Sequence, residues 1–149
     1  SFARDLRVGV IDIQKAVSGT KEWKKEFLSF KATFNREKKL ISKKEEQLKK
    51  MIENLKKQGM VLNSELKKKK EEEVLKKKRE FERYVQDRNE DLAKKEKEIT
   101  NRILRKMADV INKIGKEKNF TMILEKKVGL YFDNSVDLTA LAIQAYNKT

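Results

Sequence analysis

Residues 58–65 read QGMVLNSE, and this segment in the middle of the chain decides the fold. It is the place in the middle of the chain where glycine, asparagine and serine cluster. Gly and Asn tolerate left-handed backbone angles, and Ser64 can cap a new helix. We therefore predict two helices joined at a tip near residues 59–65. One continuous helix over residues 21–118 is the alternative.

Apolar residues recur with a heptad rhythm before this segment. Trp23, Phe27, Phe30 and Phe34 step by 4, 3 and 4, and the series of twelve positions that they begin runs to Leu62. Nine of the twelve positions are apolar, and the exceptions are Glu37, Lys44 and Gln58. The aromatic residues are expected to pack in the seam between the helices, or alternatively to contact a binding partner.

A second apolar series follows residue 73. It runs from Val74 to Ile114 and is interrupted by Lys78, Arg88 and either Lys95 or Glu96. Two series of similar length on either side of one weak point are typical of helices that zip together. The sequence therefore predicts a long antiparallel α-helical coiled-coil hairpin over residues 21–118.

The ends of the chain carry strand-like runs. Residues 6–10 alternate apolar with polar or small side chains, as a β-strand does, and Thr20 can cap the helix that follows. Near the C-terminus, residues 120–125 and 128–132 are two such runs with a Lys-Lys turn between them, which predicts a β-hairpin. A final helix follows, capped by Asp137 or Ser135.

The segments 1–20 and 119–149 together therefore predict a small β-rich body. Three short strands and one short helix in about 50 residues are too few to bury a stable core alone. Such a patch also leaves strand edges unpaired. Oligomerisation would solve both problems.

Composition excludes several classes of function. The 149 residues include no cysteine and no histidine, which removes thiol chemistry, the commonest general base and the commonest ligand of transition metals. The five glycines are isolated, so no Gly-rich phosphate loop exists. Acidic residues are interleaved with lysines, as on a solvated helix face. We expect a protein that is not an enzyme and that uses no cofactor and no metal.

Short motifs follow one another in a fixed order along the chain. They are residues 8–12 (VGVID), 79–83 (REFER), 86–87 (QD), 114–125 (IGKEKNFTMILE), 128–133 (VGLYFD) and 135–139 (SVDLT). Coiled-coil similarity alone would be unspecific, but terminal strand blocks around a helical hairpin are much more specific. This ordered set resembles the Skp/OmpH family of periplasmic chaperones over essentially the whole chain.

This resemblance implies a homotrimer in the periplasm, with a signal peptide removed. Its small β-barrel body would be built from the terminal strands of three chains, and three helical hairpins would surround a cavity. Family members hold unfolded outer-membrane β-barrel proteins there without ATP. The residues expected in the trimer body are Val8, Val10, Ile11, Ile123, Leu124, Leu130 and Phe132. Lipopolysaccharide binding is also described for the family, and the nearest candidate positions are Arg79, Arg83 and Arg88.

The lysine-rich middle of the chain is its most informative feature, and the chain as a whole carries a net charge of +14. Lysine runs keep an exposed coiled coil soluble, and they also create a positive field that captures acidic clients or anionic membrane surfaces. At the tip, an apolar segment either closes the hairpin or contacts apolar parts of a client. The expected client-binding residues are Lys67, Lys68, Lys69, Lys76, Lys77, Lys78, Met60, Val61 and Leu62.

Two other functions fit parts of the sequence. A pI near 9.8 and Lys-rich helices are the footprint of a nucleic-acid-binding protein. However, lysine outnumbers arginine, no base-reading module is visible, and aromatic residues do not interleave with the basic run, so only nonspecific binding is expected. A coiled-coil scaffold would explain the apolar seams but not the terminal strands.

Overall fold

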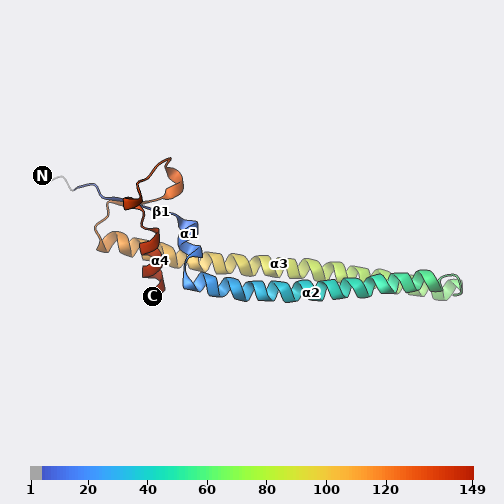
Figure 1. The fold of residues 1–149 in the computed structure, drawn as a ribbon. Helices are drawn as coiled ribbons and strands as arrows, with labels where there is room; N and C mark the ends of the chain where they lie inside the picture. Colours follow the sequence, from blue (N-terminus) through green and yellow to red (C-terminus); the bar gives the residue numbers. More distant parts are fainter. Residues whose placement is uncertain (1–4) are drawn as a thin grey trace. The chain divides into compact units, whose positions relative to one another are not determined.

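The computed structural model describes residues 5–149, so the first four residues of the predicted 1–20 segment lie outside the described part. The chain divides into two compact units (Figure 1). The terminal unit comprises the residues up to Ser29 together with Glu96–Thr149, and the hairpin unit comprises Phe30–Lys95. The elements in chain order are β1 (Val8–Ile11), α1 (Ile13–Ser18), α2 (Lys21–Gln58), α3 (Ser64–Glu117), β2 (Met122–Glu125), the 3-10 turns η1 (Lys126–Val128) and η2 (Asn134–Val136), and α4 (Thr139–Asn147).

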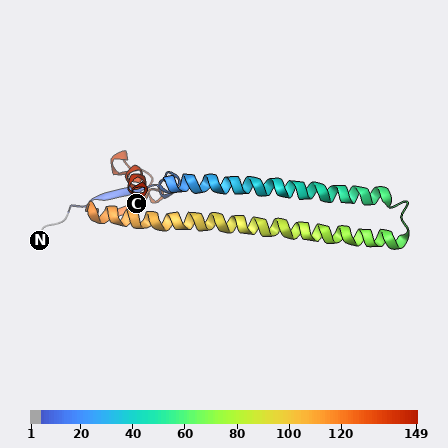
Figure 2. The same ribbon diagram turned by 90° about the horizontal axis from the view of Figure 1, so that it is seen from below.

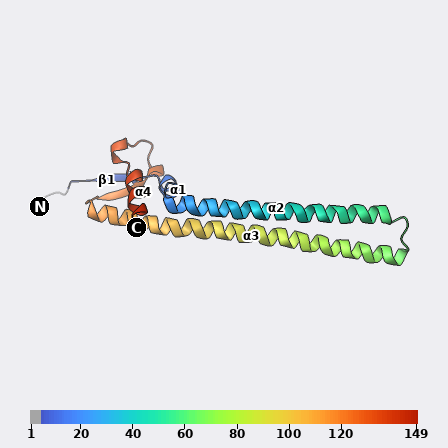
Figure 3. The ribbon, with the colours of Figure 1, turned by 60° about the horizontal axis from the view of Figure 1, so that its bottom comes forward.

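The hairpin unit is an antiparallel pair formed by the end of α2 and the beginning of α3 (Figures 2 and 3). The backbone turns where Leu62 N donates to Gln58 O at 3.1 Å. The Asn63 side chain then accepts from Leu66 N at 2.9 Å and caps α3. The prediction of two helices is confirmed. The predicted Ser64 cap is wrong by one residue, because Asn63 reaches the free N–H groups and Ser64 is already helical.

Each of the three polar positions in the α2 seam meets a side chain of α3. Tyr84 donates its hydroxyl to Glu37 at 3.0 Å, and the Lys44 ammonium lies 4.8 Å from the centre of the Tyr84 ring. Nearer the turn, Lys70 donates to the Gln58 side chain at 2.9 Å. Polar seam positions that pair in only one alignment fix the register of a helix pair.

The buried core of the described chain lies entirely in the terminal unit. Here the helix pair is joined by other elements, which shield side chains that two helices alone would leave in contact with water. Tyr146 and Met107 are among the largest side chains enclosed. The buried apolar residues are Val10, Ile11, Ala16, Val17, Ile99, Ile103, Met107, Val110, Ile114, Ala142 and Tyr146.

The sheet of the terminal unit has two parallel strands. β1 pairs with β2 in the register Val8 with Met122 through Ile11 with Glu125. On the other side of β1, Val10 O accepts from Leu138 N at 2.8 Å, and Val10 bridges to Asp137. The intervening α2 and α3 provide the crossover that a parallel connection needs.

The β-hairpin predicted at 120–125 and 128–132 is therefore wrong. The first run does contain a strand, but its partner is β1, more than 100 residues earlier. The Lys-Lys turn winds into η1, where Lys126 forms an ion pair with Asp137 at 3.1 Å. Both sides of β1 are thus occupied, and residues 129–133 take no strand conformation. The body segments are less rich in β-structure than the sequence suggested.

The final helix α4 is positioned by Asp137, one of the two predicted caps. The Asp137 carboxylate accepts from Thr139 Oγ1 at 2.6 Å and from Thr139 N at 2.9 Å. These bonds, together with Lys126, lower the pKa of the Asp137 carboxyl. Thr139 Oγ1 also accepts from Asp12 N at 3.0 Å, which ties the start of α4 to the exit of β1.

Thr20 caps α2 as predicted, and its side chain is fully buried. Its hydroxyl accepts from Trp23 N at 3.1 Å and donates to Val17 O at 2.8 Å. We expect Thr20→Ala to lower the free energy of unfolding by about 1–2 kcal/mol, because the cap on Trp23 N is lost and the Val17 carbonyl keeps only the backbone N–H of residue 20 as a donor. Thermal unfolding followed by circular dichroism, at matched protein concentrations, measures this change.

Thr20→Ser is the matched control because it keeps the hydroxyl. It should retain most of the stability, losing only the packing of one methyl group. Equal losses for the Ala and Ser variants would show that packing, and not capping, is what Thr20 contributes.

Candidate functional site

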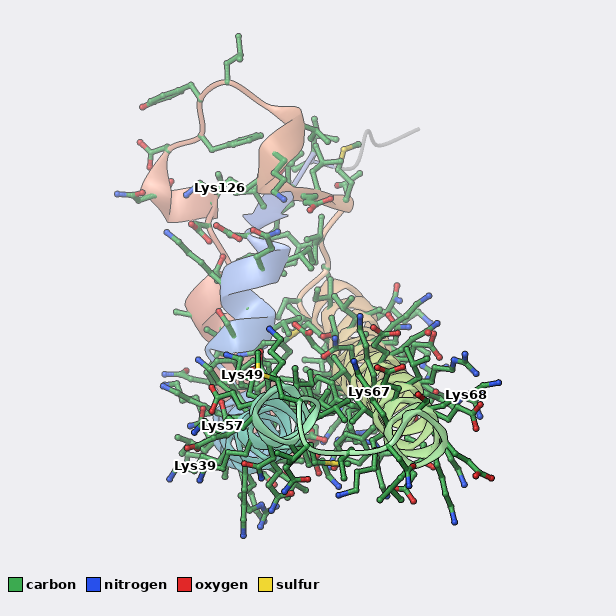
Figure 4. All side chains as sticks on the ribbon, turned by 90° about the vertical axis from the view of Figure 1, so that its right-hand side faces the viewer. Lys39, Lys49, Lys57, Lys67, Lys68 and Lys126 are labelled. Carbon is green, nitrogen blue, oxygen red and sulfur yellow. The ribbon has the colours of Figure 1, made fainter. Side chains whose placement is uncertain are left out.

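The hairpin unit presents an excess of positive charge that local ion pairs do not neutralise. Residues 30–95 hold 22 basic and 13 acidic side chains. All six lysines predicted to bind clients are exposed, and among them only Lys77 forms an ion pair within the described chain, with Glu80 at 3.5 Å. In Figure 4, Lys39 and Lys57 project from the outer side of α2, and Lys68 projects from the outer side of α3. The lysines thus surround the helix pair and do not converge on one point.

The three predicted arginines do not form one cluster. Arg79 and Arg83 line the same shallow hollow of about 440 Å³ on α3, together with Asp87. Arg88 instead lies with its guanidinium 5.5 Å from the centre of the Tyr84 ring and pairs with Asp91 at 3.0 Å. The ring contact explains how the α3 seam accommodates Arg88.

The tip offers two free apolar side chains. Met60 is 96% exposed and Val61 is 83% exposed, whereas Leu62 is half-buried. Only Leu62 therefore helps to close the end of the hairpin. The other two are available for a partner.

A groove between the two helices of the hairpin unit was not foreseen from the sequence. Its floor is formed by the half-buried side chains of Leu48, Met51 and Phe81, and its volume is about 390 Å³. Its lining is completed by Lys44 and Gln47 of α2 and by Lys77, Glu80 and Tyr84 of α3. The signal in the sequence was the break in the α2 seam at Lys44, immediately before Leu48 and Met51. We call this feature the seam groove.

The aromatic stripe of α2 is only partly covered. In the terminal unit, the Trp23 and Phe27 rings stack with centroids 6.2 Å apart, and in the hairpin unit the Phe30 and Phe34 rings lie 6.5 Å apart. Phe27 and Phe34 remain exposed, while Trp23 and Phe30 are half-buried. Packing within one chain therefore accounts for part of the stripe.

The terminal unit also carries an uncovered apolar surface. Among the residues expected in a trimer body, Val10 and Ile11 are buried within the protomer, and Val8, Ile123 and Phe132 are half-buried. Leu124 and Leu130 are exposed, the latter at 109%. Other exposed apolar residues of the same terminal segments are Leu6, Met122, Val128 and Tyr131.

A charged network, also missed in the sequence, joins α2, α3 and α4 within the terminal unit. The Tyr146 hydroxyl donates to the Glu22 carboxylate, which Arg102 and Lys106 approach at 3.5 and 3.6 Å. Arg102 also reaches Glu26 at 2.8 Å. The Tyr146 hydrogen bond and the two cations lower the pKa of the Glu22 carboxyl although partial burial opposes them. Desolvation and the Glu22 contact raise the pKa of the Tyr146 hydroxyl.

Within residues 5–149, no group of three or more acidic side chains is arranged to hold a metal ion. The helices of this described part are also not long and apolar enough for any of them to cross a bilayer.

Comparison with known proteins decides the family. The family model described as outer membrane protein (OmpH-like) matches residues 7–146, which is nearly the whole chain. This chain belongs to the OmpH-like family. The family resemblance inferred from the terminal motifs is thereby confirmed.

A solved structure shows the same fold as this OmpH-like chain. It is a crystal structure of an OmpH-like protein from Caulobacter crescentus CB15, described as a candidate outer membrane chaperone. The TM-score is 0.88 at 12% sequence identity, over 99% of this chain and 87% of that one. No curated protein matches this chain in sequence. The fold of the OmpH-like family is thus retained at low identity.

The Glu22 network makes the stability of this OmpH-like protein sensitive to acid. Because the folded-state pKa of Glu22 lies below its ordinary value of 4.5, the network contributes stability above that pH and loses it as pH falls through the folded-state pKa. We expect Glu22→Gln to lower the unfolding midpoint at pH 7 and to reduce the further fall between pH 7 and pH 3.5. Thermal unfolding at both pH values provides the measurement.

Asp137→Asn is a suitable comparison, because the pKa of Asp137 is also lowered but by other partners. The two variants should each remove a part of the acid sensitivity. If Glu22→Gln showed the same loss between pH 7 and pH 3.5 as the unmodified protein, the carboxylate would have no such role.

Proposed function

We propose that this OmpH-like protein is an ATP-independent chaperone of the periplasm that holds unfolded outer-membrane β-barrel proteins between basic helical arms. It would prevent their aggregation and aid their delivery to the outer membrane. The observation that carries the proposal is the unneutralised lysine surface around a hairpin whose apolar seam is only half-buried. Membership of the OmpH-like family supports the same role.

The two kinds of surface suit the two stages of binding. Exposed lysines act at a distance and raise the rate of encounter with an acidic chain. Half-buried apolar side chains and the tip residues Met60 and Val61 act at contact. Several weak contacts on linked arms hold a client by effective concentration, without a tight site on any one arm.

A trimer built through the terminal unit is part of this proposal. The exposed side chains of Leu124, Leu130 and Tyr131 would be covered by other copies of the chain, and the open edge of β2 would be paired. Three hairpins could then surround one client. Lipopolysaccharide and anionic membrane surfaces are further proposed partners, with Arg79 and Arg83 as the contact residues, whereas Arg88 is engaged with Tyr84 and Asp91.

Solution mass tests the trimer. We expect about three times the chain mass of 17.6 kDa in analytical ultracentrifugation at micromolar concentration. Leu130→Glu should shift the protein toward smaller species, because it places a charge in an apolar interface. Leu75→Glu is the matched control, since Leu75 is also exposed but lies on α3 in the hairpin unit, outside the terminal unit through which the trimer is proposed to form. A stable 17.6 kDa species of the unmodified protein would contradict the trimer.

The lysine surface is tested by removing its charge. Replacing Lys67, Lys68, Lys69, Lys76, Lys77 and Lys78 by Gln removes six charges with little change in helix propensity. We expect slower capture of a denatured, acidic outer-membrane barrel at low salt, and a weaker dependence of the on-rate on salt. Stopped-flow fluorescence of a labelled barrel gives the on-rate.

The same six positions changed to Arg form the control, because the charge is kept. If lysines act only as solubilising groups, the Gln variant captures the barrel as fast as the Arg variant does. Retention of duplex DNA at physiological salt, with no protection of the barrel, would favour the nucleic-acid-binding alternative instead.

A further inference from the structure

The seam groove lies beside the polar contacts that fix the register of the hairpin unit. Tyr84 is held by its hydrogen bond to Glu37, and Lys44 lies over its ring. Immediately next to this contact, the helices leave an open space of about 390 Å³ above Leu48, Met51 and Phe81. We expect the groove to persist as a feature of the helix pair, because Tyr84 and Lys44 in its lining also form contacts between the two helices.

The floor of the seam groove suits an aromatic side chain. Leu48, Met51 and Phe81 are half-buried within the pair, and no third element of the hairpin unit covers them. The volume falls within the range of about 300–1,000 Å³ that is usual for ligand pockets. Met51 can adapt its shape to a ring, and sulfur–aromatic contacts are favourable.

The rim of the seam groove suits a carboxylate. Lys44 forms no ion pair within residues 5–149, and its ammonium contacts only the face of the Tyr84 ring. Lys77 pairs with Glu80 at 3.5 Å in an exposed, weak interaction. The rim of the seam groove thus carries two ammonium groups, of Lys44 and Lys77, and one carboxylate, of Glu80. One further carboxylate from a partner would balance this charge.

We propose that the seam groove binds an aromatic side chain of an unfolded client together with a carboxylate two residues away from it. In an extended chain, residues i and i+2 point to the same side and lie about 6.5–7 Å apart. The ring enters the floor, and the carboxylate meets Lys44 and Lys77 at the rim. The inference rests on the proposed function, because it names the feature of the client that each arm recognises.

Short peptides of fixed composition test the spacing. The probe is GSGFSDGSG, with both ends blocked so that no terminal charges remain. GSGFDSGSG has the same composition and charge, but its ring and carboxylate point to opposite sides. GSGFSNGSG lacks the charge, and GSGSSDGSG lacks the ring. We expect GSGFSDGSG to bind at least about threefold more tightly than each of the others.

The methionines of the chain report where a peptide binds. There are four, and each lies in a different place: Met51 in the groove, Met60 at the tip, Met107 in the core and Met122 on β2. With ¹³C-labelled methionine methyl groups, GSGFSDGSG should shift the Met51 signal and leave the Met60 and Met107 signals in place. Met51→Leu assigns the signal.

Two variants of equal charge separate the groove from the general positive field. Lys44→Gln with Lys77→Gln removes the rim, and Lys39→Gln with Lys68→Gln removes two outward-facing lysines, one from each helix. The first pair should weaken GSGFSDGSG binding at least about threefold, and the second should leave it nearly unchanged. Circular dichroism checks that both variants keep their helices.

Equal affinity for GSGFSDGSG and GSGFDSGSG, equal effects of the two variants, or a shift at Met60 in place of Met51 would each overturn the inference. Protection of a denatured barrel from aggregation is measured in parallel. If the protein protects the barrel from aggregation but the peptide does not shift the Met51 signal, the proposed function stands and the inference about the seam groove fails. If the peptide shifts the Met51 signal but the protein does not protect the barrel, the inference about the seam groove stands and the proposed function fails.

Discussion

Two helices packed against each other can shield only one face of each from water, and this constraint governs the whole chain. Every buried apolar side chain of the described residues lies in the terminal unit, where strands and short helices add further cover. In the hairpin unit, seam residues such as Leu48 and Phe81 remain half-buried. Stability from burial is therefore concentrated in the terminal unit, and a surface that can interact with other chains is concentrated in the hairpin unit.

The same constraint explains why polar groups occupy the seam. An apolar pair with little burial has several alignments of nearly equal energy, and a slip of one heptad costs little. Glu37 with Tyr84 and Gln58 with Lys70 form only in one alignment. These bonds lie near the surface, so each adds little stability. Their contribution is specificity of register, which in turn fixes the shape of the seam groove.

Local patterns predicted the helices well and the sheet poorly. The heptad series and the QGMVLNSE segment determine their own conformation, so the two helices and their junction could be derived from residues 21–118. Likewise Thr20 acts on the N–H groups that follow it directly. The strand partner of Met122–Glu125 lies more than 100 residues away, and no local signal distinguishes a parallel pairing with β1 from a hairpin with residues 128–132.

The features of the candidate site also separate into those that local sequence predicts and those that depend on contacts between distant segments. Exposed lysines and the exposed tip follow from composition and position, so they could be foreseen. The Glu22 network and the seam groove could not, because each depends on side chains that come together only once α2 and α3 are aligned. Arg88 is a separate case: the family resemblance made it a lipopolysaccharide-binding candidate with Arg79 and Arg83, but within α3 it lies one turn after Tyr84 and its guanidinium contacts that ring.

The lysines and the exposed apolar seam depend on each other. A half-buried apolar stripe on a free hairpin would promote association with other copies of the same chain. Copies of this chain carry the same excess of positive charge, with 22 basic against 13 acidic residues in the hairpin unit, so their hairpins repel one another. An unfolded acidic polypeptide is attracted by the same field. Under the proposed function, one distribution of charge would therefore keep the apolar seams of separate copies apart and leave them open to acidic clients, so solubility and client capture would be two consequences of a single surface.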